Sequence, residues 1–312
     1  MTSPQADNMS EDSPTTVYLA IYIITFLIGF PNSVLAFCSC IHKIHSKPIP
    51  IDIFMLNLVI SDLIFLAFLP IKMKEAADDM VWNMSRFLCD FHLFVFLLPV
   101  YSSSLFLTAI SAERYVCIAF PVMYKSPKRI IYTVPICIFI WLIIAVVSIF
   151  VYKAGHIDSA DADNSTDQHP LVTEPQTCYS TFTAKQLQEL LPARLSLAVA
   201  FFFLLLFTCC FCYINFIRLL LKRPLIKRQL KLRAFGLALG TLLVFASSFA
   251  PYNISHLVGF IKNENPKWRM TALMLSTLNA CYDPIIFFCI SREMRRAIKV
   301  CAKAFSQFFQ PI

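Results

Sequence analysis

The sequence predicts an all-α protein: a seven-transmembrane helix bundle followed by a short amphipathic helix on the membrane surface. Of its 312 residues, 58% are hydrophobic and only 15% are charged, whereas a soluble domain has about 25% charged residues. A soluble globule of this length could not bury so much apolar surface, which argues against a soluble enzyme or binding module. Disorder is excluded because the chain is too apolar and too aromatic.

Seven stretches are long and apolar enough to cross a membrane. A spanning helix needs about 20 apolar residues, because lipid offers no hydrogen-bond partner to an exposed backbone group. In chain order the stretches cover 17–41, 51–73, 87–120, 131–152, 190–221, 232–261 and 268–290. The chain therefore divides into an N-terminal segment (1–16), a domain of seven spans (17–290), and a terminal helix with a short tail (291–312).

The charges give the spans an orientation. If the N-terminus lies outside, 18 of the 27 Lys and Arg residues lie on the cytoplasmic side, and 14 of the 19 Asp and Glu residues lie on the outer side. This distribution follows the positive-inside rule. We expect a multi-pass plasma-membrane protein with an extracellular N-terminus and a cytoplasmic C-terminus. The basic residues lie close to helix ends instead of forming a groove, which argues against nucleic acid as a partner.

Both ends of the chain carry candidate modification sites. Asn8 and Asn164 begin Asn-X-Ser/Thr glycosylation sequons on segments expected outside the cell. In the terminal helix, apolar residues recur at helical spacing opposite basic ones, as in a helix that lies on the inner leaflet. Cys301 on its apolar side is either a palmitoylation site or a plain buried thiol.

The twelve cysteines do not indicate a disulfide-rich scaffold. Most of them lie within the spans, where cysteine behaves as a small buried hydrophobe. Only Cys89 and Cys178 lie at the oxidising outer face, so we expect a disulfide between them. Cys209, Cys210 and Cys212 have no accompanying His and point in different directions, so we expect no metal site there.

A few ionisable residues lie at membrane depth, where they are functional candidates by default. Asp62 lies in the middle of the second stretch and Asp283 in the middle of the seventh. Pro284 follows Asp283 and loosens the backbone, which makes a hinge plausible at this point. Glu113 and Arg114 close the third stretch, either as interfacial charges or as a pair that can separate.

These residues belong to a wider pattern that resembles the rhodopsin-like (class A) G-protein-coupled receptors along nearly the whole chain. Arg114 follows Cys89 by 25 residues, as in that family. The other matching positions, in chain order, are Asn32, Asn57, Asp62, Tyr115, Trp141, Tyr213, Phe249, Pro251, Asp283, Pro284 and Phe287. No single motif is specific, but so many in the right helices and order are.

Three segments narrow the resemblance to the free fatty acid receptors, and among them to the short-chain members, receptors 2 and 3. They are 191–195, 251–259 and the pair 268–269; the inner loop at 119–125 agrees. The resemblance implies a receptor, not an enzyme, for free carboxylates, with short-chain fatty acids as the leading class. It also implies coupling to heterotrimeric G proteins of the Gi/o type, the Gq type, or both.

The expected ligand site lies at the outer ends of the fifth to seventh stretches. Arg194 and Arg269 each lie about one turn inside the outer boundary, and a guanidinium binds a carboxylate through two charge-assisted hydrogen bonds. Tyr252 and His256 are four residues apart, hence on one helical face, and can donate further bonds. Glu174 of the outer loop could pair with one Arg in the empty pocket.

The sequence departs from the short-chain receptors at three positions. Val147, Leu97 and Leu205 stand where those receptors carry His, Tyr and Pro. We expect a less polar pocket floor and leave the preferred chain length open. The alternatives are another anionic ligand (a medium- or long-chain fatty acid, a hydroxy acid or a lysolipid) or a carboxylate transporter using Asp62 and Asp283 as a proton relay. The odd number of spans and the absence of repeats disfavour the transporter.

The resemblance also suggests how binding becomes a signal. In this hypothesis the sixth stretch pivots near Pro251, and Arg114 leaves Glu113 to engage Tyr213. The remaining candidate switch residues are Tyr115, Phe249, Asp283, Pro284 and Phe287. By family position Asp62, Ser103, Asn279 and Asp283 would surround an allosteric sodium ion; no other metal and no cofactor is expected.

We expect only weak arrestin binding. The third inner loop, 222–229, contains no Ser or Thr, and the tail after residue 290 contains only Ser291 and Ser306. Phosphorylation-dependent capture needs clustered phosphates opposite Lys and Arg.

Overall fold

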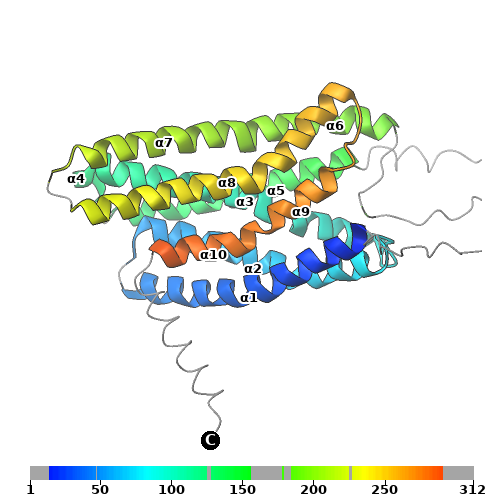
Figure 1. Cartoon of the computed structure of the whole chain (residues 1–312), viewed down its shortest axis with the longest axis horizontal. Helices are drawn as coiled ribbons and strands as arrows, with labels where there is room; N and C mark the ends of the chain where they lie inside the picture. Colours follow the sequence, from blue (N-terminus) through cyan, green and yellow to red (C-terminus); the bar gives the residue numbers. More distant parts are fainter. Residues whose placement is uncertain are drawn as a thin grey trace, which may run out of the picture.

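The computed structural model describes residues 14–46, 48–124, 128–155, 178, 184–224 and 227–290. Within these ranges the regular structure is helical, and the long helices lie side by side in one bundle (Figure 1). The candidate sites at Asn8, Asn164, Glu174 and Cys301 lie outside the described residues, as does the predicted terminal helix.

All seven predicted spans are helical. Their bounds are α1 (Pro14–Ser46), α2 (Pro50–Ala77), α3 (Arg86–Ala119), α5 (Lys128–Gly155), α6 (Ala184–Ala198) continued by the π-helical turn η3 (Val199–Phe203) and α7 (Leu204–Leu221), α8 (Arg228–Lys262), and finally α9 (Arg269–Thr277) with α10 (Asn279–Ile290). The short helix α4 (Pro121–Tyr124) lies between α3 and α5. The predicted all-α bundle is confirmed.

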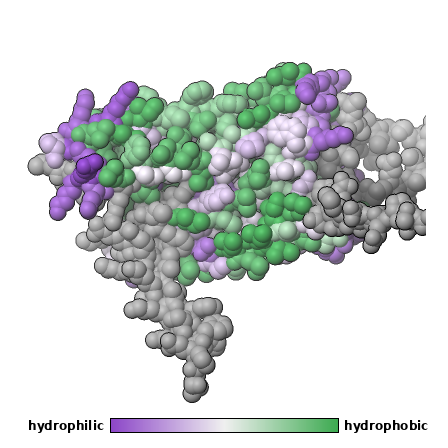
Figure 2. All heavy atoms as spheres, in the orientation of Figure 1, coloured by the Kyte–Doolittle hydropathy of each residue, from purple (hydrophilic) through white to green (hydrophobic). Residues whose placement is uncertain are grey.

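Six of the described helices are each long and apolar enough to cross a membrane without interruption. They present large hydrophobic side chains outwards, and Figure 2 shows the resulting apolar surface between hydrophilic ends. At one of these ends Lys222, Arg223, Lys227 and Arg228 are exposed. A lipid-facing belt of this kind is what a spanning bundle requires.

The seventh span is interrupted at Leu278, between α9 and α10. Asp283 and Pro284, where we expect a hinge, lie within α10, so the structure adds a second irregular point to this span. Just before Leu278, the hydroxyl groups of Ser276 and Thr277 donate to the carbonyl oxygens of Leu273 (2.5 Å) and Met274 (2.7 Å). Hydroxyls bonded to the backbone in this way compete with the helical ladder and bend helices.

Local sequence explains where other helices begin, end or bend. Pro50 occupies the first turn of α2, and the Ser85 side chain accepts the Leu88 N–H at the start of α3 (3.3 Å). Pro251 lies inside α8, which changes direction towards its second half (Figure 1). Asn263 ends α8 in the left-handed region, with φ of 53°.

Gly259 allows the turn after α8 to fold back closely. A Cβ atom at this position would lie 3.0 Å from the carbonyl oxygen of Glu264 and 3.2 Å from Pro266. Contacts that short would push the turn outwards. The missing side chain therefore lets Asn265, which lies between them, face the bundle.

Helix α3 lies at the centre of the bundle, with the fully buried Phe106 on its inner length. Phe106 packs edge-on against Trp141 of α5, with ring centroids 6.2 Å apart. Trp141 donates its indole N–H to the Asn57 side-chain oxygen of α2 at 2.9 Å. These contacts tie three helices together near the middle of the membrane.

The predicted disulfide is present between Cys89 and Cys178. It joins the start of α3 to the segment before α6, and both residues are buried beside Trp82. The bridge therefore holds part of the outer loop over the ends of α2 and α3.

Replacing Trp141 by Phe should destabilise the bundle by about 1–2 kcal/mol, because the Asn57 oxygen loses its donor in a region without water. The measurement is the midpoint of thermal unfolding of the purified protein in detergent, which should fall by several degrees. Leu142→Ala is the matched control. Leu142 is the next residue of the same helix, and its side chain is 59% exposed on the outer surface of the bundle. An unchanged midpoint in the Trp141 variant would refute this role of the hydrogen bond.

Candidate functional site

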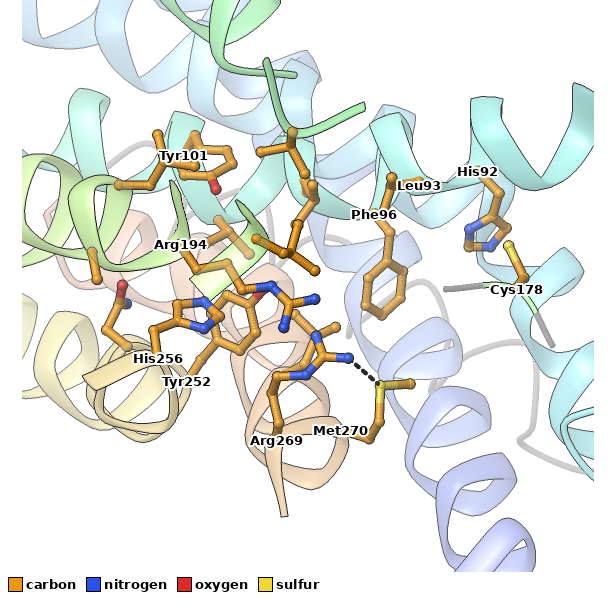
Figure 3. A pocket seen from close by; sticks show the side chains of 18 of the residues that line it. His92, Leu93, Phe96, Tyr101, Cys178, Arg194, Tyr252, His256, Arg269 and Met270 are labelled. Atoms are coloured by element: carbon orange, nitrogen blue, oxygen red, sulfur yellow. Dashed lines mark hydrogen bonds between the residues drawn. The ribbon is translucent and has the colours of Figure 1, made fainter. Parts of the chain in front are cut away.

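A cavity opens among the outer ends of the helices. Its walls come from α2, α3, α5, α6, α8 and α9, together with Cys178 (Figure 3). All four residues predicted to bind the ligand line it: Arg194, Tyr252, His256 and Arg269. The helices thus bring together residues that are up to 75 positions apart in the chain.

The two arginines share one acceptor. Arg194 donates Nη1–H to Oδ1 of Asn265 at 3.3 Å, and Arg269 donates Nε–H to the same oxygen at 2.8 Å. Two hydrogen bonds to one atom hold the guanidinium groups close together although like charges repel. Asn265 is neutral, so it brings the two guanidinium groups together without adding a negative charge.

Tyr252 and His256 complete this end of the cavity. The ring centroids are 4.3 Å apart at an angle of 73°, and Tyr252 is a side-chain hydrogen-bond partner of Arg269. His256 is 5% exposed, and its Nδ1 has no partner among the described residues. In Figure 3 both side chains lie next to the two guanidinium groups. We refer to Arg194, Tyr252, His256 and Arg269 as the cationic end of the cavity.

The charged side chains that line the cavity are basic. They are those of Lys72, Arg194 and Arg269, of which Lys72 is paired with Glu75, and no Asp or Glu is among the described lining residues. An anion therefore gains electrostatically on entering, and a cation is repelled.

Only one of the three departures from the short-chain receptors lies at the cavity. Leu97 lines it, whereas Val147 is buried in the helix packing and Leu205 packs against the core without reaching the cavity. Tyr101 also lines the wall. The expectation of a less polar floor therefore rests on Leu97 alone.

The sequence did not reveal the roles of Asn265, Lys72 and His92. Asn265 precedes a proline in a turn, and nothing in its neighbourhood indicates that it contacts two arginines. Lys72 and His92 lie on helices α2 and α3, and only the packing of those helices places both at the same cavity. Lys72 could have been noticed in the sequence, because a basic residue within a membrane span usually either has a function or extends to the membrane interface.

A buried polar cluster lies deeper in the bundle. Oδ2 of Asp283 accepts hydrogen bonds from Ser103 (3.3 Å) and Asn279 (2.5 Å), and Asn279 also donates to Ser103 (2.9 Å). Both carboxylate oxygens of Asp62, Oδ1 of Asp283 and Oδ1 of Asn279 have no partner within the described part of the chain. Ser103, Asn279 and Asp283 are thus brought together, and unpaired oxygens of this type suit a hard cation. Elsewhere in the described ranges, no three His, Cys, Asp or Glu side chains gather as metal ligands do.

At the cytoplasmic end the pairing differs from the sequence hypothesis. We expected Glu113 to pair with Arg114, but Glu113 binds Arg129 of α5 instead, through contacts of 2.9 to 3.1 Å. Arg114 donates Nη1–H to the Tyr213 hydroxyl at 3.3 Å. The reason is that Arg129 engages both carboxylate oxygens of Glu113, so that neither is left for Arg114. The structure therefore contains the Arg114–Tyr213 contact that we assigned to the signalling state.

Tyr124 of α4 supports the new pairing. Its ring lies 5.0 Å from the Arg129 guanidinium carbon, in a cation–π contact. Burial, together with the nearby Glu113 carboxylate, raises the pKa of the Tyr124 phenol above its usual value. The aromatic face and the carboxylate together hold Arg129 in place.

The other predicted switch residues are spread along the bundle. Phe249 is fully buried and packs edge-on against Phe245, whereas Tyr115 is partly exposed and contacts Phe211. Pro251 and Pro284 lie inside α8 and α10. Phe287 belongs to α10, but its side chain is outside the described part of the chain.

Comparison with known families gives a match to the 7 transmembrane receptor (rhodopsin family) over residues 32–287. The chain belongs to this family of receptors. This rhodopsin-family receptor is therefore a multi-pass plasma-membrane protein that responds to a small-molecule ligand and acts on a G protein; it is not an enzyme, and the transporter alternative falls away.

The receptor is similar to curated proteins over most of its length. Free fatty acid receptor 3 of Mus musculus is 36% identical over 279 residues, which cover 89% of this chain and 84% of that protein. Free fatty acid receptor 2 of Mus musculus is 38% identical over 294 residues, covering 93% and 86%. Free fatty acid receptor 1 of Macaca fascicularis is 31% identical over 280 residues, covering 88% and 91%. The resemblance found in the sequence motifs is confirmed.

Because Arg129 holds the Glu113 carboxylate, we expect its replacement to change basal activity. In Arg129→Gln the freed Glu113 carboxylate can compete with Tyr213 for Arg114. Basal nucleotide exchange on the G protein should therefore fall about threefold. A factor of three corresponds to less than about 1 kcal/mol, as expected for a partly buried ion pair. The measurement is GTPγS binding to receptor-containing membranes without ligand. Glu113→Gln combined with Arg129→Gln is the control, since the competing charge is gone and activity should return. An equal loss in the single and double variants would contradict the competition.

Proposed function

We propose that this protein is a receptor for free carboxylates, with short-chain fatty acids as the leading ligand class, and that it couples to Gi/o-type or Gq-type heterotrimeric G proteins. The observation that carries the proposal is the sharing of the neutral Asn265 oxygen by Arg194 and Arg269. The names of the similar proteins, free fatty acid receptors 1, 2 and 3, support the same ligand class.

A carboxylate fits the cationic end by charge and by geometry. Each guanidinium can direct two N–H groups at the two carboxylate oxygens, and such charge-assisted bonds are stronger than neutral ones. The carboxylate can replace the Asn265 oxygen as the common acceptor. Tyr252 and His256 offer further hydrogen bonds beside it.

The size of the ligand limits its affinity. A short-chain acid has about 4–6 heavy atoms, and at a ceiling of about −1.5 kcal/mol per atom four atoms give about −6 kcal/mol, or tens of micromolar. Such a receptor can respond only to an abundant metabolite. The apolar part of the ligand would lie against Leu97 and Leu273, which line the same cavity.

Binding becomes a signal through a shift between two states. A ligand that draws the outer ends of α6 and α9 together favours the state in which Arg114 contacts Tyr213, provided that it binds this state better than the other. The kink at Pro251 lets the cytoplasmic half of α8 move relative to its outer half. The G protein then binds at the basic inner ends of the helices, and the membrane lipid is the second partner of that surface.

Longer anionic ligands are a second candidate class. The cavity extends from Arg194 and Arg269 past Phe96 to His92, so its lining reaches beyond the groups that would bind a short carboxylate. Medium- or long-chain fatty acids, hydroxy acids or lysolipids would use the same arginines.

We also propose that sodium stabilises the inactive state. The unpaired oxygens of Asp62 and Asp283 would bind the ion, with Ser103 and Asn279 beside them. A bound cation would supply the positive charge that two buried carboxylates need.

The topology and the modifications remain proposals as well. In this assignment residues 1–16 are extracellular, 17–290 form the receptor domain, and 291–312 form a cytoplasmic helix and tail. Asn8 and Asn164 would carry glycans and Cys301 a palmitoyl group. Arrestin would bind weakly, because Ser291 and Ser306 are too few and too far apart to present clustered phosphates.

Removing either arginine should abolish most of the carboxylate response. Arg194→Ala and Arg269→Ala each lose charge-assisted bonds of about 2–3 kcal/mol, or roughly 30- to 150-fold in potency. The measurement is a C2 to C18 carboxylate series read by cAMP and calcium. Lys262→Ala is the control, since it removes an exposed charge from the same outer face. A full response of both Arg variants at normal surface expression would refute the carboxylate site.

Sodium should lower agonist affinity, and the effect should require Asp62. Replacing NaCl by choline chloride at equal ionic strength is expected to raise agonist affinity in the wild type, because the ion binds only the inactive state. In Asp62→Asn the two salts should give the same affinity. The measurement is competition binding in membranes. If the wild-type protein has the same agonist affinity in NaCl and in choline chloride, the sodium site is refuted.

A further inference from the structure

The cavity has a second polar end, which the carboxylate does not use. In Figure 3 the side chains of the cationic end lie on one side, and His92 lies on the other side next to Cys178. Phe96 and Leu93 lie between them and form an apolar stretch of wall. Lys72 also lines the cavity and places its ammonium 5.5 Å from the centre of the Phe96 ring. We call Lys72 and His92 the distal end.

Unlike the cationic end, the distal end is electrically balanced. Lys72 forms an ion pair with Glu75, one turn further along α2, at 2.5 Å, and both side chains are buried. The pair carries no net charge, so a second carboxylate here would have to compete with Glu75 for the ammonium. The distal end therefore favours a neutral group over an anion.

His92 has unused hydrogen-bonding capacity. The residue is 4% exposed, and its Nε2 has no partner within the described ranges. Its ring is fixed by an edge-on contact with Trp82 at 6.0 Å and a tilted contact with Phe96 at 5.8 Å. Buried polar atoms normally have partners, so those left over next to a cavity point to a bound polar group.

We propose that the cavity takes a carboxylate of medium length whose far end carries a hydroxyl group. The carboxylate binds at the cationic end, the chain passes Leu93 and Phe96, and the terminal hydroxyl hydrogen-bonds His92. This inference rests on the proposed carboxylate function and deepens it, because it specifies what the part of the cavity beyond a short acid recognises.

A hydroxyl suits His92 better than other neutral groups do. Neutral imidazole has one donor and one acceptor nitrogen, and either can be the one that faces the ligand. A hydroxyl both donates and accepts, so it satisfies Nε2 in either tautomer. A terminal methyl group leaves that nitrogen unpaired and gains only apolar contact.

The experiment compares pairs of acids with equal numbers of heavy atoms, one ending in a hydroxyl group and one in a methyl group. The pairs run from about 6 to about 12 heavy atoms, a range whose upper part fills far more of the cavity than a short acid does. The readout is the ratio of the two potencies in a G-protein activation assay on cells with equal surface expression. In the wild type we expect the hydroxy acid to be about tenfold more potent at one chain length.

Three variants assign this preference to one residue. His92→Phe keeps a ring of similar size without polar atoms and should bring the ratio to about one. His92→Gln keeps a donor and an acceptor and should retain the preference. Tyr101→Phe is the matched control, because it removes a hydroxyl near Arg194 at the other end of the cavity and should leave the ratio unchanged.

Two results would overturn the inference: methyl-terminated acids at least as potent at every length in the wild type, or a preference that persists in His92→Phe. The first needs no variant, so poor folding of a His92 variant cannot hide it. A receptor at the cell surface that responds to no carboxylate would refute the proposed function itself. A response to simple acids without any hydroxyl preference would refute only this inference.

Discussion

The structure depends on one constraint: the membrane interior offers neither donors nor acceptors, so polar groups at that depth must find partners inside the bundle. Trp141 and Asn57 obey it by bonding to each other between α5 and α2. The hydroxyl groups of Ser104, Thr108 and Ser111 obey it by donating to carbonyl oxygens of their own helix, α3. Against this background, a polar atom that stays unpaired is informative, because keeping it costs about 1–3 kcal/mol of folding free energy.

The buried charges fall into two groups by this criterion. Lys43 with Asp52, Lys72 with Glu75, and Arg129 with Glu113 are pairs that neutralise each other between or within helices. The two oxygens of Asp62 have no partner in the described part of the chain, and the two arginines at the cavity share one neutral oxygen. The first group ties helices together. The second group lies where we propose that external ions bind, a cation at Asp62 and a carboxylate at the two arginines.

The sequence was sufficient for features that depend on composition and order along the chain. Apolar runs gave the seven spans, and position outside the membrane gave the Cys89–Cys178 bridge. The four residues of the cationic end followed from the resemblance and the helical spacing of Tyr252 and His256. Contacts between distant segments could not be read in this way. Asn265 reaches the arginines because a glycine lets its turn fold back, and Glu113 meets Arg129 because α5 packs beside α3.

The interruption at Leu278 divides the seventh span into two parts that belong to different sites. Arg269 lies on α9 and therefore belongs to the ligand cavity, whereas Asn279 and Asp283 lie on α10 and belong to the buried polar cluster. In an unbroken helix the two sites would rotate together as one rigid rod. With the ladder interrupted between them, and with Ser276 and Thr277 holding the carbonyl oxygens of the last turn, α9 can adjust to a ligand by turning at Leu278. Asn279 is the first residue of α10, and its side chain donates to both Ser103 and Asp283. A turn at Leu278 would therefore act directly on the cluster that would hold the cation, without requiring a displacement of Pro284.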